Sequence, residues 1–304
     1  MKIRIGTRGS QLALWQSHLV KNLLQAQGYE SEIIVIHTYG DQQTQQPLHL
    51  LGTQGIFTKA LDDALLNNEI DMAVHSCKDI PSEIHKDLFI SSVLKREEPQ
   101  DVLLSIDDTV HLENQSKSFV IGTSSLRRVS LLKHYFNQHI IKDIRGNLDT
   151  RIEKLMKGEY DALILAYAGV KRMGLEKYIR QRLSKEVFVP AVGQGAIAIM
   201  TRKNDEYHYK LSQLINHHQT YTEILCERNY LKTVQGGCQL PVFGYARIFM
   251  ENINLLAGIA SVDGKLLIKN QSSDNIEKAR ELGIYLGNKI LNEGGKELIY
   301  ANKN

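Results

Sequence analysis

Cysteine is scarce in this sequence of 304 residues, which contains only Cys77, Cys226 and Cys238. The three are odd in number and too widely spaced for a CxxC pair or a zinc-binding pattern, so we expect no metal site. No apolar run approaches the roughly 18–20 residues that span a bilayer. Residues 1–6 alternate polar and apolar side chains and lack the apolar stretch of a signal peptide. We therefore predict a cytoplasmic protein in a reducing compartment, without membrane contact.

A surplus of charge of one sign is also missing. The 37 basic and 34 acidic residues leave a net charge of only +3, which is too small for a nucleic-acid-binding protein. Any functional positive charge must therefore be local. Hydrophobic residues make up 42% and charged residues 23% of the chain, the balance of a soluble globular protein. The length suggests two or three domains.

The first two thirds alternate between strand-like and helix-like segments. The first series consists of strands at 3–7, 33–36 and 70–74 and of helical stripes at 12–24 and 57–66. A second series after residue 100 consists of strands at 119–121 and 162–166 and of helices at 126–135 and 148–156. This βαβα rhythm predicts two successive α/β domains of similar construction.

The last third has a different pattern. Thr220 and Glu223 have capping-box spacing and predict a helix start. Asp263-Gly264 is a hairpin signal between two strand-like runs. The expected elements are strands at 242–249, 253–260 and 266–268 and a final helix from 276 to 291, ending before Gly294-Gly295. We expect a small α+β domain, and the fold class is thus two α/β domains plus a C-terminal α+β domain.

Arginines and hydroxyl residues recur where predicted strands end. In Gly122-Thr-Ser-Ser-Leu-Arg-Arg128 a strand is followed by a glycine turn and a helix start. Free backbone N–H groups there attract an anion, and an arginine can bind a carboxylate with its planar fork. The alternative is an ordinary helix cap followed by solvated arginines. The same arrangement recurs at Thr7–Ser10, at Arg145–Arg151 and at Arg172, which favours a site for a small molecule with several negative groups.

Two further segments could carry chemistry. In Ala73–Pro81 a strand ends in Lys78-Asp79, and an acid among arginines could stabilise a cationic intermediate. A strand-end ion pair is the alternative, and His75 is expected to be a packed or hydrogen-bonded histidine. Cys238 follows two glycines in an accessible loop where a thiolate could react. Pro190–Ala196 lacks a full phosphate-loop pattern, so we discount nucleotide binding.

Taken in order, these segments resemble the porphobilinogen deaminase family over nearly the whole chain. The segments that carry the resemblance are Gly6–Trp15, Ala73–Pro81, Gly122–Arg128, Arg145–Asn147, Ala168–Arg172, Pro190–Ala196 and Gly236–Cys238. The resemblance implies two periplasmic-binding-protein-like α/β domains and a third, cysteine-bearing domain. It implies that the chain returns to its first domain near Gly193–Gln194. The expected domains are 1–97 with 195–216, then 98–194, then 217–304.

The resemblance also implies a transferase of tetrapyrrole (haem) biosynthesis. Such an enzyme deaminates four porphobilinogen molecules and joins them head to tail into hydroxymethylbilane. A dipyrromethane cofactor, bound through a thioether to Cys238, primes the chain. The implied catalytic residues are Asp79 and Lys78. The implied cofactor-binding residues are Cys238, Ser10, Lys78, Asp79, Thr123, Ser124, Ser125, Arg127, Arg128, Arg145 and Gly146. The implied substrate-binding residues are Arg8, Ser10, Arg145, Arg151, Arg172 and Gln194.

The resemblance implies a monomer that binds porphobilinogen and neither nucleic acid nor membrane. The sequence departs from the family's common pattern at Tyr39, Gln54 and Cys77. A non-catalytic anion-binding protein of periplasmic-binding-protein build is the alternative from another class. A cysteine-dependent acyl or thiol enzyme would need a histidine base near Cys238, and nothing in the sequence places His217 or His218 there.

Overall fold

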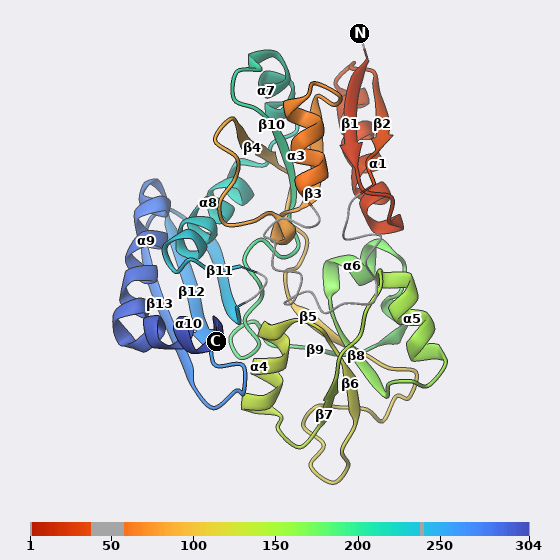
Figure 1. Cartoon of the computed structure of the whole chain (residues 1–304), viewed down its shortest axis with the longest axis vertical. Coiled ribbons are helices and arrows are strands. Elements are labelled where there is room, and N and C mark those ends of the chain that lie inside the picture. The colour runs from red at the N-terminus through yellow and green to blue at the C-terminus, as the bar shows by residue number, and fades with distance from the viewer. Residues whose placement is uncertain (1, 38–57, 238–239, 304) are drawn as a thin grey trace. The chain divides into compact units, whose positions relative to one another are not determined.

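The computed structural model describes residues 2–37, 58–237 and 240–303. By their contacts these residues divide into two compact units (Figure 1). The first unit contains residues 1–97 and 195–222, and the second contains residues 98–194 and 223–304. The predicted three-domain boundaries stay a prediction. No helix among the described residues is long and apolar enough to cross a bilayer.

The first unit is a five-stranded sheet with helices on both faces. Its strand order is β2-β1-β3-β10-β4, in which β1 runs parallel to β2 and β3 while β10 runs antiparallel to β3 and β4. The elements are β1 (Ile3–Thr7), α1 (Gln11–Ala26), β2 (Ser31–Val35), α3 (Lys59–Leu66), β3 (Met72–Ser76), the 3-10 helix η1 (Cys77–Asp79), β4 (Leu88–Val93), β10 (Ile197–Arg202) and α7 (Glu206–Gln213).

Alternation within the strands sends side chains to opposite faces of this sheet. On one face, apolar residues of β1, β3 and β10 pack against Val20 and Leu24 of α1 and Leu211 of α7. Helix α3 covers the other face, where a side-chain carbon at Gly6 would collide with Ile70 and Leu61. The helical stripe predicted for α1 is thus confirmed at Val20 and Leu24, whereas Trp15 at its start is exposed.

A second sheet in the other unit repeats the same order. The order is β7-β6-β8-β5-β9, with β6 parallel to β7 and β8 and with β5 antiparallel to β8 and β9. The elements are β5 (Asp101–Leu104), β6 (Val120–Gly122), α4 (Leu126–Tyr135), β7 (Ile140–Lys142), α5 (Leu148–Met156), β8 (Ala162–Ala166), α6 (Tyr167–Arg172), the 3-10 helix η2 (Glu176–Tyr178) and β9 (Ile179–Arg182).

Each crossover of the chain supplies the fourth strand of the sheet that it enters. The chain leaves the first unit after Glu97 and forms β5; it returns at Gly195 and forms β10. In each sheet this strand runs antiparallel to both of its neighbours. The return of the chain near Gly193–Gln194, which the resemblance implies, agrees with these strand positions.

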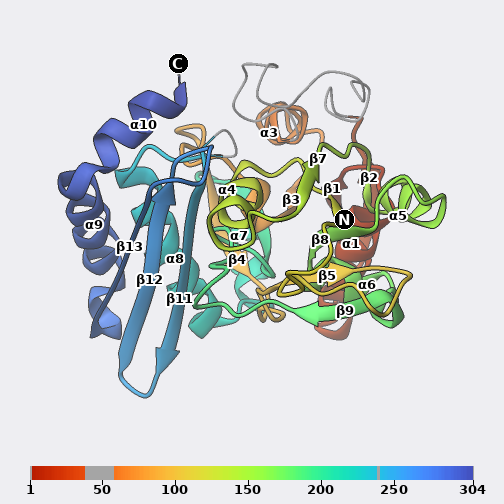
Figure 2. The ribbon, with the colours of Figure 1, turned by 90° about the horizontal axis from the view of Figure 1, so that it is seen from below.

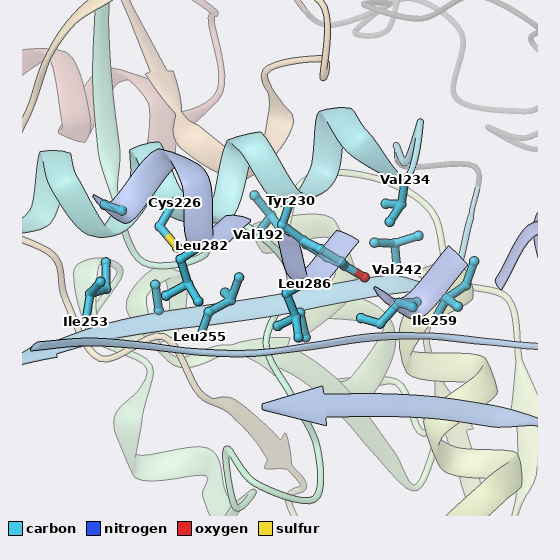
Figure 3. Packing of buried hydrophobic residues seen from close by; sticks show 14 of the residues in the cluster. Val192, Cys226, Tyr230, Val234, Val242, Ile253, Leu255, Ile259, Leu282 and Leu286 are labelled. Carbon is cyan, nitrogen blue, oxygen red and sulfur yellow. The ribbon is translucent and has the colours of Figure 1, made fainter. Parts of the chain in front are cut away.

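The C-terminal part is an antiparallel three-stranded sheet covered by helices (Figure 2). Cys226 and Tyr230 of α8, Val234 directly after this helix, and Leu282 and Leu286 of α9 pack on one face of this sheet (Figure 3). The elements are α8 (His218–Thr233), β11 (Val242–Phe249), β12 (Asn252–Ala260), β13 (Leu267–Asn275), the 3-10 helix η3 (Ile276–Lys278), α9 (Ala279–Ile290), the turn η4 (Leu291–Gly295) and α10 (Lys296–Lys303).

The opposite face of this sheet belongs to a core that it shares with the second α/β sheet. Phe243 and Ala260 are buried in one cluster with Phe119, Phe188 and other residues of 98–194. The hairpin tip also contacts α4, since the Gly264 carbonyl accepts a hydrogen bond from His134 Nδ1 at 2.8 Å. This contact explains why residues 98–194 and 223–304 form one unit.

The predicted fold class is confirmed, with two local corrections. Helix α8 begins at His218, so Thr220 and Glu223 lie inside it and do not form the predicted capping box. Glu223 instead accepts a hydrogen bond from the backbone N–H of Ile248 at 3.1 Å. The last predicted helix ends as expected before the two glycines, but the chain then turns at Gly294 (φ 106°) and forms α10.

Candidate functional site

The predicted residues of the first unit follow the carboxyl ends of its parallel strands. Arg8 and Ser10 follow β1, and Lys78 and Asp79 follow β3. Ser10 is the N-cap of α1, and its side chain accepts a hydrogen bond from the backbone N–H of Ala13 at 3.4 Å. Because β1 and β3 are parallel neighbours, both pairs lie at one edge of the sheet.

A small pocket of about 80 Å³ lies at this edge. Its lining residues are Arg8, Ser10, Leu12, Ala13, Gln16, Thr58, Val74, His75, Ser76 and Asp79. Asp79 ends the 3-10 helix η1, and Pro81 shortly after it prevents a regular helix from following. Asp79 and Lys78 are both half-buried. The pocket thus combines an arginine, a hydroxyl group and a carboxylate.

His75 is buried in the wall of this pocket. Burial, assisted by the charge of Arg8, lowers the pKa of His75 to about 4. Its Nε2 atom has no hydrogen-bond partner among the described residues. The prediction of a packed histidine agrees with this burial.

In the second unit, the hydroxyl residues are held by the loops in which they lie. The backbone N–H of Ile144 donates a hydrogen bond to Ser124 Oγ at 3.2 Å, and Ser124 Oγ also contacts the Ile144 carbonyl. Thr123 Oγ1 accepts a hydrogen bond from the Ser125 N–H at 3.3 Å. Ser125 is the N-cap of α4 but makes no side-chain capping bond, so backbone N–H groups at this helix start lack a side-chain cap.

Arg127 and Arg128 are buried, with exposed fractions of only 4% and 6%. Arg127 Nη2 donates to Asp101 Oδ2 at 2.7 Å. Arg128 donates from Nη2 and Nε to Asp101 Oδ1 at 2.7 and 3.0 Å. The alternative of solvated arginines is therefore wrong, although the two side chains do bind a carboxylate, that of Asp101.

The other predicted site arginines of this unit, Arg145, Arg151 and Arg172, come after the carboxyl ends of parallel strands. Arg145 comes after β7 and lies 3.2 Å from Asp143. Arg151 in α5 donates to the Gly146 carbonyl at 2.9 Å, and Gly146 has φ +108°. Arg172 is the last residue of α6, which follows β8, and is half-buried. Since β6, β7 and β8 are parallel, these residues share an edge of the sheet with the start of α4.

Gln194 is buried and belongs to the same cluster as the two buried arginines. Its Nε2 donates to Asp101 Oδ1 at 3.0 Å and to the Pro99 carbonyl at 2.6 Å. Cys238 lies outside the described residues, as do Tyr39 and Gln54. Cys226 is buried, and burial raises the pKa of its thiol far above the ordinary value, which removes it as a competing nucleophile.

The buried cluster fits an anionic group such as a dipyrromethane with its carboxylates. Two arginines face one aspartate, so the cluster carries a surplus positive charge inside the protein. Burial lowers the pKa of Arg127, and the attraction of Asp101 offsets this only in part. Arg127 Nε is buried and has no hydrogen-bond partner among the described residues. A carboxylate would satisfy both the charge and this donor.

Asp101 is the residue that the sequence reasoning missed. Its signal was weak: an aspartate directly after the segment where the chain crosses between units. Residues 2–37, 58–237 and 240–303 contain no group of three or more histidine, cysteine, aspartate or glutamate side chains that could hold a metal ion.

Two family descriptions match this chain. Residues 3–210 match the porphobilinogen deaminase, dipyromethane cofactor binding domain, and residues 221–292 match the porphobilinogen deaminase, C-terminal domain.

Solved structures resemble the fold more loosely. The periplasmic VFT2 domain of BvgS from Bordetella pertussis is 16% identical, with a TM-score of 0.42, over 70% of this chain and 86% of that chain. YhfZ from Shigella flexneri is 14% identical, with a TM-score of 0.38, over 77% of this chain and 91% of that chain.

Proposed function

The chain belongs to the porphobilinogen deaminase (hydroxymethylbilane synthase) family, and from that premise we propose that it builds a linear tetrapyrrole. Four porphobilinogen molecules lose ammonia and are joined head to tail into hydroxymethylbilane, on a dipyrromethane primer attached to Cys238. The observation that carries this proposal is the surplus positive charge of the buried cluster of Arg127, Arg128 and Asp101. It lies within the matched dipyrromethane cofactor binding domain.

The cofactor has several carboxylates, and the second unit offers donors that suit them. When bound, the dipyrromethane supplies the free pyrrole carbon from which the chain grows. Arg127 and Arg128 neutralise its carboxylates, and the uncapped start of α4 adds backbone donors. The proposed cofactor-binding residues are Cys238, Ser10, Lys78, Asp79, Thr123, Ser124, Ser125, Arg127, Arg128, Arg145 and Gly146.

Asp79, with its neighbour Lys78, is the proposed catalytic residue. Positive charge develops on porphobilinogen as ammonia leaves, and a fixed carboxylate nearby lowers the energy of that charge. Asp79 lines a pocket whose other polar residues include Arg8 and Ser10. An arginine in the same pocket can hold a substrate carboxylate while the aspartate faces the reacting ring.

The substrate itself carries an acetate and a propionate group, so it needs cationic partners of its own. The proposed substrate-binding residues are Arg8, Ser10, Arg145, Arg151, Arg172 and Gln194. The half-buried arginines among them combine access with a partly desolvated environment, where a charge-assisted hydrogen bond is stronger than in water. The cytoplasmic location and the monomeric state stay predictions.

The intact mass of the denatured protein, with peptide mapping around Cys238, tests this function. We expect a two-pyrrole adduct on the peptide that contains Cys238. Cys238→Ser should lack the adduct, whereas Cys226→Ala should keep it, because Cys226 is fully buried and its thiol has a raised pKa.

An unmodified Cys238 would first call for incubation with porphobilinogen and a second mass measurement. If the mass still did not change, the catalytic proposal would give way to a non-catalytic anion-binding protein of the same build. That alternative predicts reversible binding of carboxylates without release of ammonia.

A further inference from the structure

Asp101 stands at a distinctive point of the chain. It is the first residue of β5, directly after the segment by which the chain enters the second unit. Strand β5 runs antiparallel to β8, and Asp101 is paired with Ala166, the last residue of β8. The start of β5 therefore lies at the edge where the parallel strands end, next to the start of α4.

The side chain of Asp101 is completely buried and accepts hydrogen bonds from three other side chains. Its Oδ2 accepts from Arg127, and its Oδ1 accepts from Arg128 and from Gln194, at distances of 2.7 to 3.0 Å. Burial would raise the pKa of Asp101, but the charges of the two arginines outweigh it and lower the pKa. The carboxylate is thus fixed in its charged form.

The donors are each held at a second point as well. Arg127 Nη1 donates to the Val189 carbonyl at 2.8 Å, and Arg128 Nη1 donates to the Ile164 carbonyl at 2.9 Å. Two anchor points per planar guanidinium determine its orientation. With both groups held this way, Arg127 Nε is left buried and without a partner among residues 2–37, 58–237 and 240–303.

A second buried aspartate in the first unit shows what a balanced cluster looks like. Asp71 pairs with Arg4 at 2.7 Å and lies 3.7 Å from Arg202, which pairs with Asp205 at 2.5 Å. There the charges of two arginines are matched by those of two aspartates, and His208 lies 2.8 Å from Asp205 and 3.8 Å from Asp71 as well. In the Asp101 cluster two arginines face one aspartate, so stabilisation of the fold alone does not explain its composition.

We propose that Asp101 is a positioning residue that holds Arg127 and Arg128 in the orientation in which they receive the carboxylates of the cofactor. This role rests on the proposed function, which assigns those carboxylates to the two arginines. Asp101 also ties the arginines to both crossover segments, because Gln194 bridges Asp101 and the Pro99 carbonyl. The single carboxylate orients both cations while leaving one positive charge for the ligand.

The test compares cofactor loading in three full-length variants made by cell-free synthesis without porphobilinogen. Asp101→Asn keeps the shape of the side chain but removes its charge, Asp71→Asn is the matched control, and Arg128→Gln tests the ligand role itself. Folded protein is selected by gel filtration and circular dichroism. Porphobilinogen is then added, and the mass increase of two pyrrole units is followed over time.

We expect Asp101→Asn to load at least tenfold more slowly than the wild type, and Asp71→Asn to load within twofold of it. A merely structural role would lower the unfolding temperature of Asp101→Asn but leave the loading rate of its folded fraction unchanged, which would overturn the proposal. Normal loading of Arg128→Gln would instead refute the proposed ligand role of the arginine pair.

If Asp101→Asn does not fold, Asp101→Glu takes its place. It keeps the negative charge and displaces the carboxylate by one methylene group. Slow loading of this variant is the expected result, because position is what the residue supplies. Loading at the wild-type rate would mean that only the charge matters, and the positioning role would be wrong.

Discussion

Asp79 is the residue on which the proposed chemistry depends most directly. It is half-buried at the end of η1 and lines the pocket beside Arg8 and Ser10. Asp79→Asn removes the negative charge without changing the shape of the side chain. We expect porphobilinogen turnover at saturation to fall by about 100-fold or more, since a fixed charge that stabilises a transition state contributes on this order.

Glu83→Gln is the matched control for Asp79→Asn, because Glu83 is exposed and outside the pocket. It should keep wild-type turnover, and both variants should keep the wild-type circular dichroism spectrum. Near-normal turnover of Asp79→Asn would remove this residue from the mechanism.

His75 predicts a pH dependence of stability. Its folded pKa of about 4 lies below the ordinary 6.5, mainly through burial. Between these two values the unfolded chain binds a proton that the folded protein does not, so stability decreases as pH falls from 6.5 to 4. Between pH 7.5 and pH 5 we expect His75 to account for a loss of about 2 kcal/mol in the free energy of unfolding.

The measurement is denaturant unfolding of the wild type and of His75→Gln at the two pH values. Trp15 is the one tryptophan of the chain and lies in the first unit with His75, so its fluorescence reports on the relevant unit. The wild type should lose more stability than the variant on acidification. Equal losses would mean that His75 takes up its proton as readily in the folded protein as in the unfolded chain.

The fate of Arg127 and Arg128 shows what the sequence could predict at this scale. The glycine turn after a strand placed the two arginines at the start of a helix, where they are found. Their partner could not be foreseen, because Asp101 is 26 and 27 residues away and is brought close only by the pairing of β5 with β8. The crossing of the chain from one sheet into the other leaves no local signature in the sequence.

At the scale of elements, the hairpin between β12 and β13 docks on α4. Gly264 lies at its tip with φ +74°, and a side-chain carbon there would lie 2.6 Å from Lys133 Cβ and 2.9 Å from the Ser130 carbonyl oxygen. Gly264→Ala should destabilise the second unit through left-handed strain of about 1 kcal/mol and through overpacking of about 1–3 kcal/mol.

Gly158→Ala is the matched control, because Gly158 has φ +73° in the same unit but nothing within 4 Å of the added carbon. It should show the strain alone. Urea unfolding followed by far-ultraviolet circular dichroism gives both free energies, and hydrogen exchange should increase in α4 only for Gly264→Ala. Equal destabilisation by the two substitutions would mean that the hairpin tip does not press on the helix.

Periodicity predicted most elements, because burial on one face imposes a repeat that the sequence must carry. Strands β1, β8 and β11 have the predicted bounds. The start of α8 was placed three residues late, since Thr220 and Glu223 have the spacing of a capping box but make other contacts. Thr220 Oγ1 accepts from the Arg96 N–H at 3.2 Å, a partner more than a hundred residues distant in the chain.

At the scale of the whole molecule, two α/β domains of similar construction could be expected from the sequence, but the strand order of their sheets and the places of β5 and β10 could not. The two α/β rhythms were visible as separate series. That β5 and β10 each complete the sheet after a crossover depends on pairings between segments such as Val74 and Ile199. Such pairings are a property of the folded chain, and apolar residues in both strands would suit several other neighbours.

The position of β10 between two strands that precede it in the chain has a consequence for the synthesis of this protein. In the first sheet β10 lies between β3 and β4, yet about 100 residues separate the end of β4 from the start of β10. A ribosome that adds 5–20 residues per second needs about 5–20 seconds to supply the missing strand. Throughout that interval the nascent chain presents two strands whose common partner has not been synthesised. Exposed strand edges of this kind pair with other chains, so we expect the nascent polypeptide to be prone to aggregation until translation delivers β10.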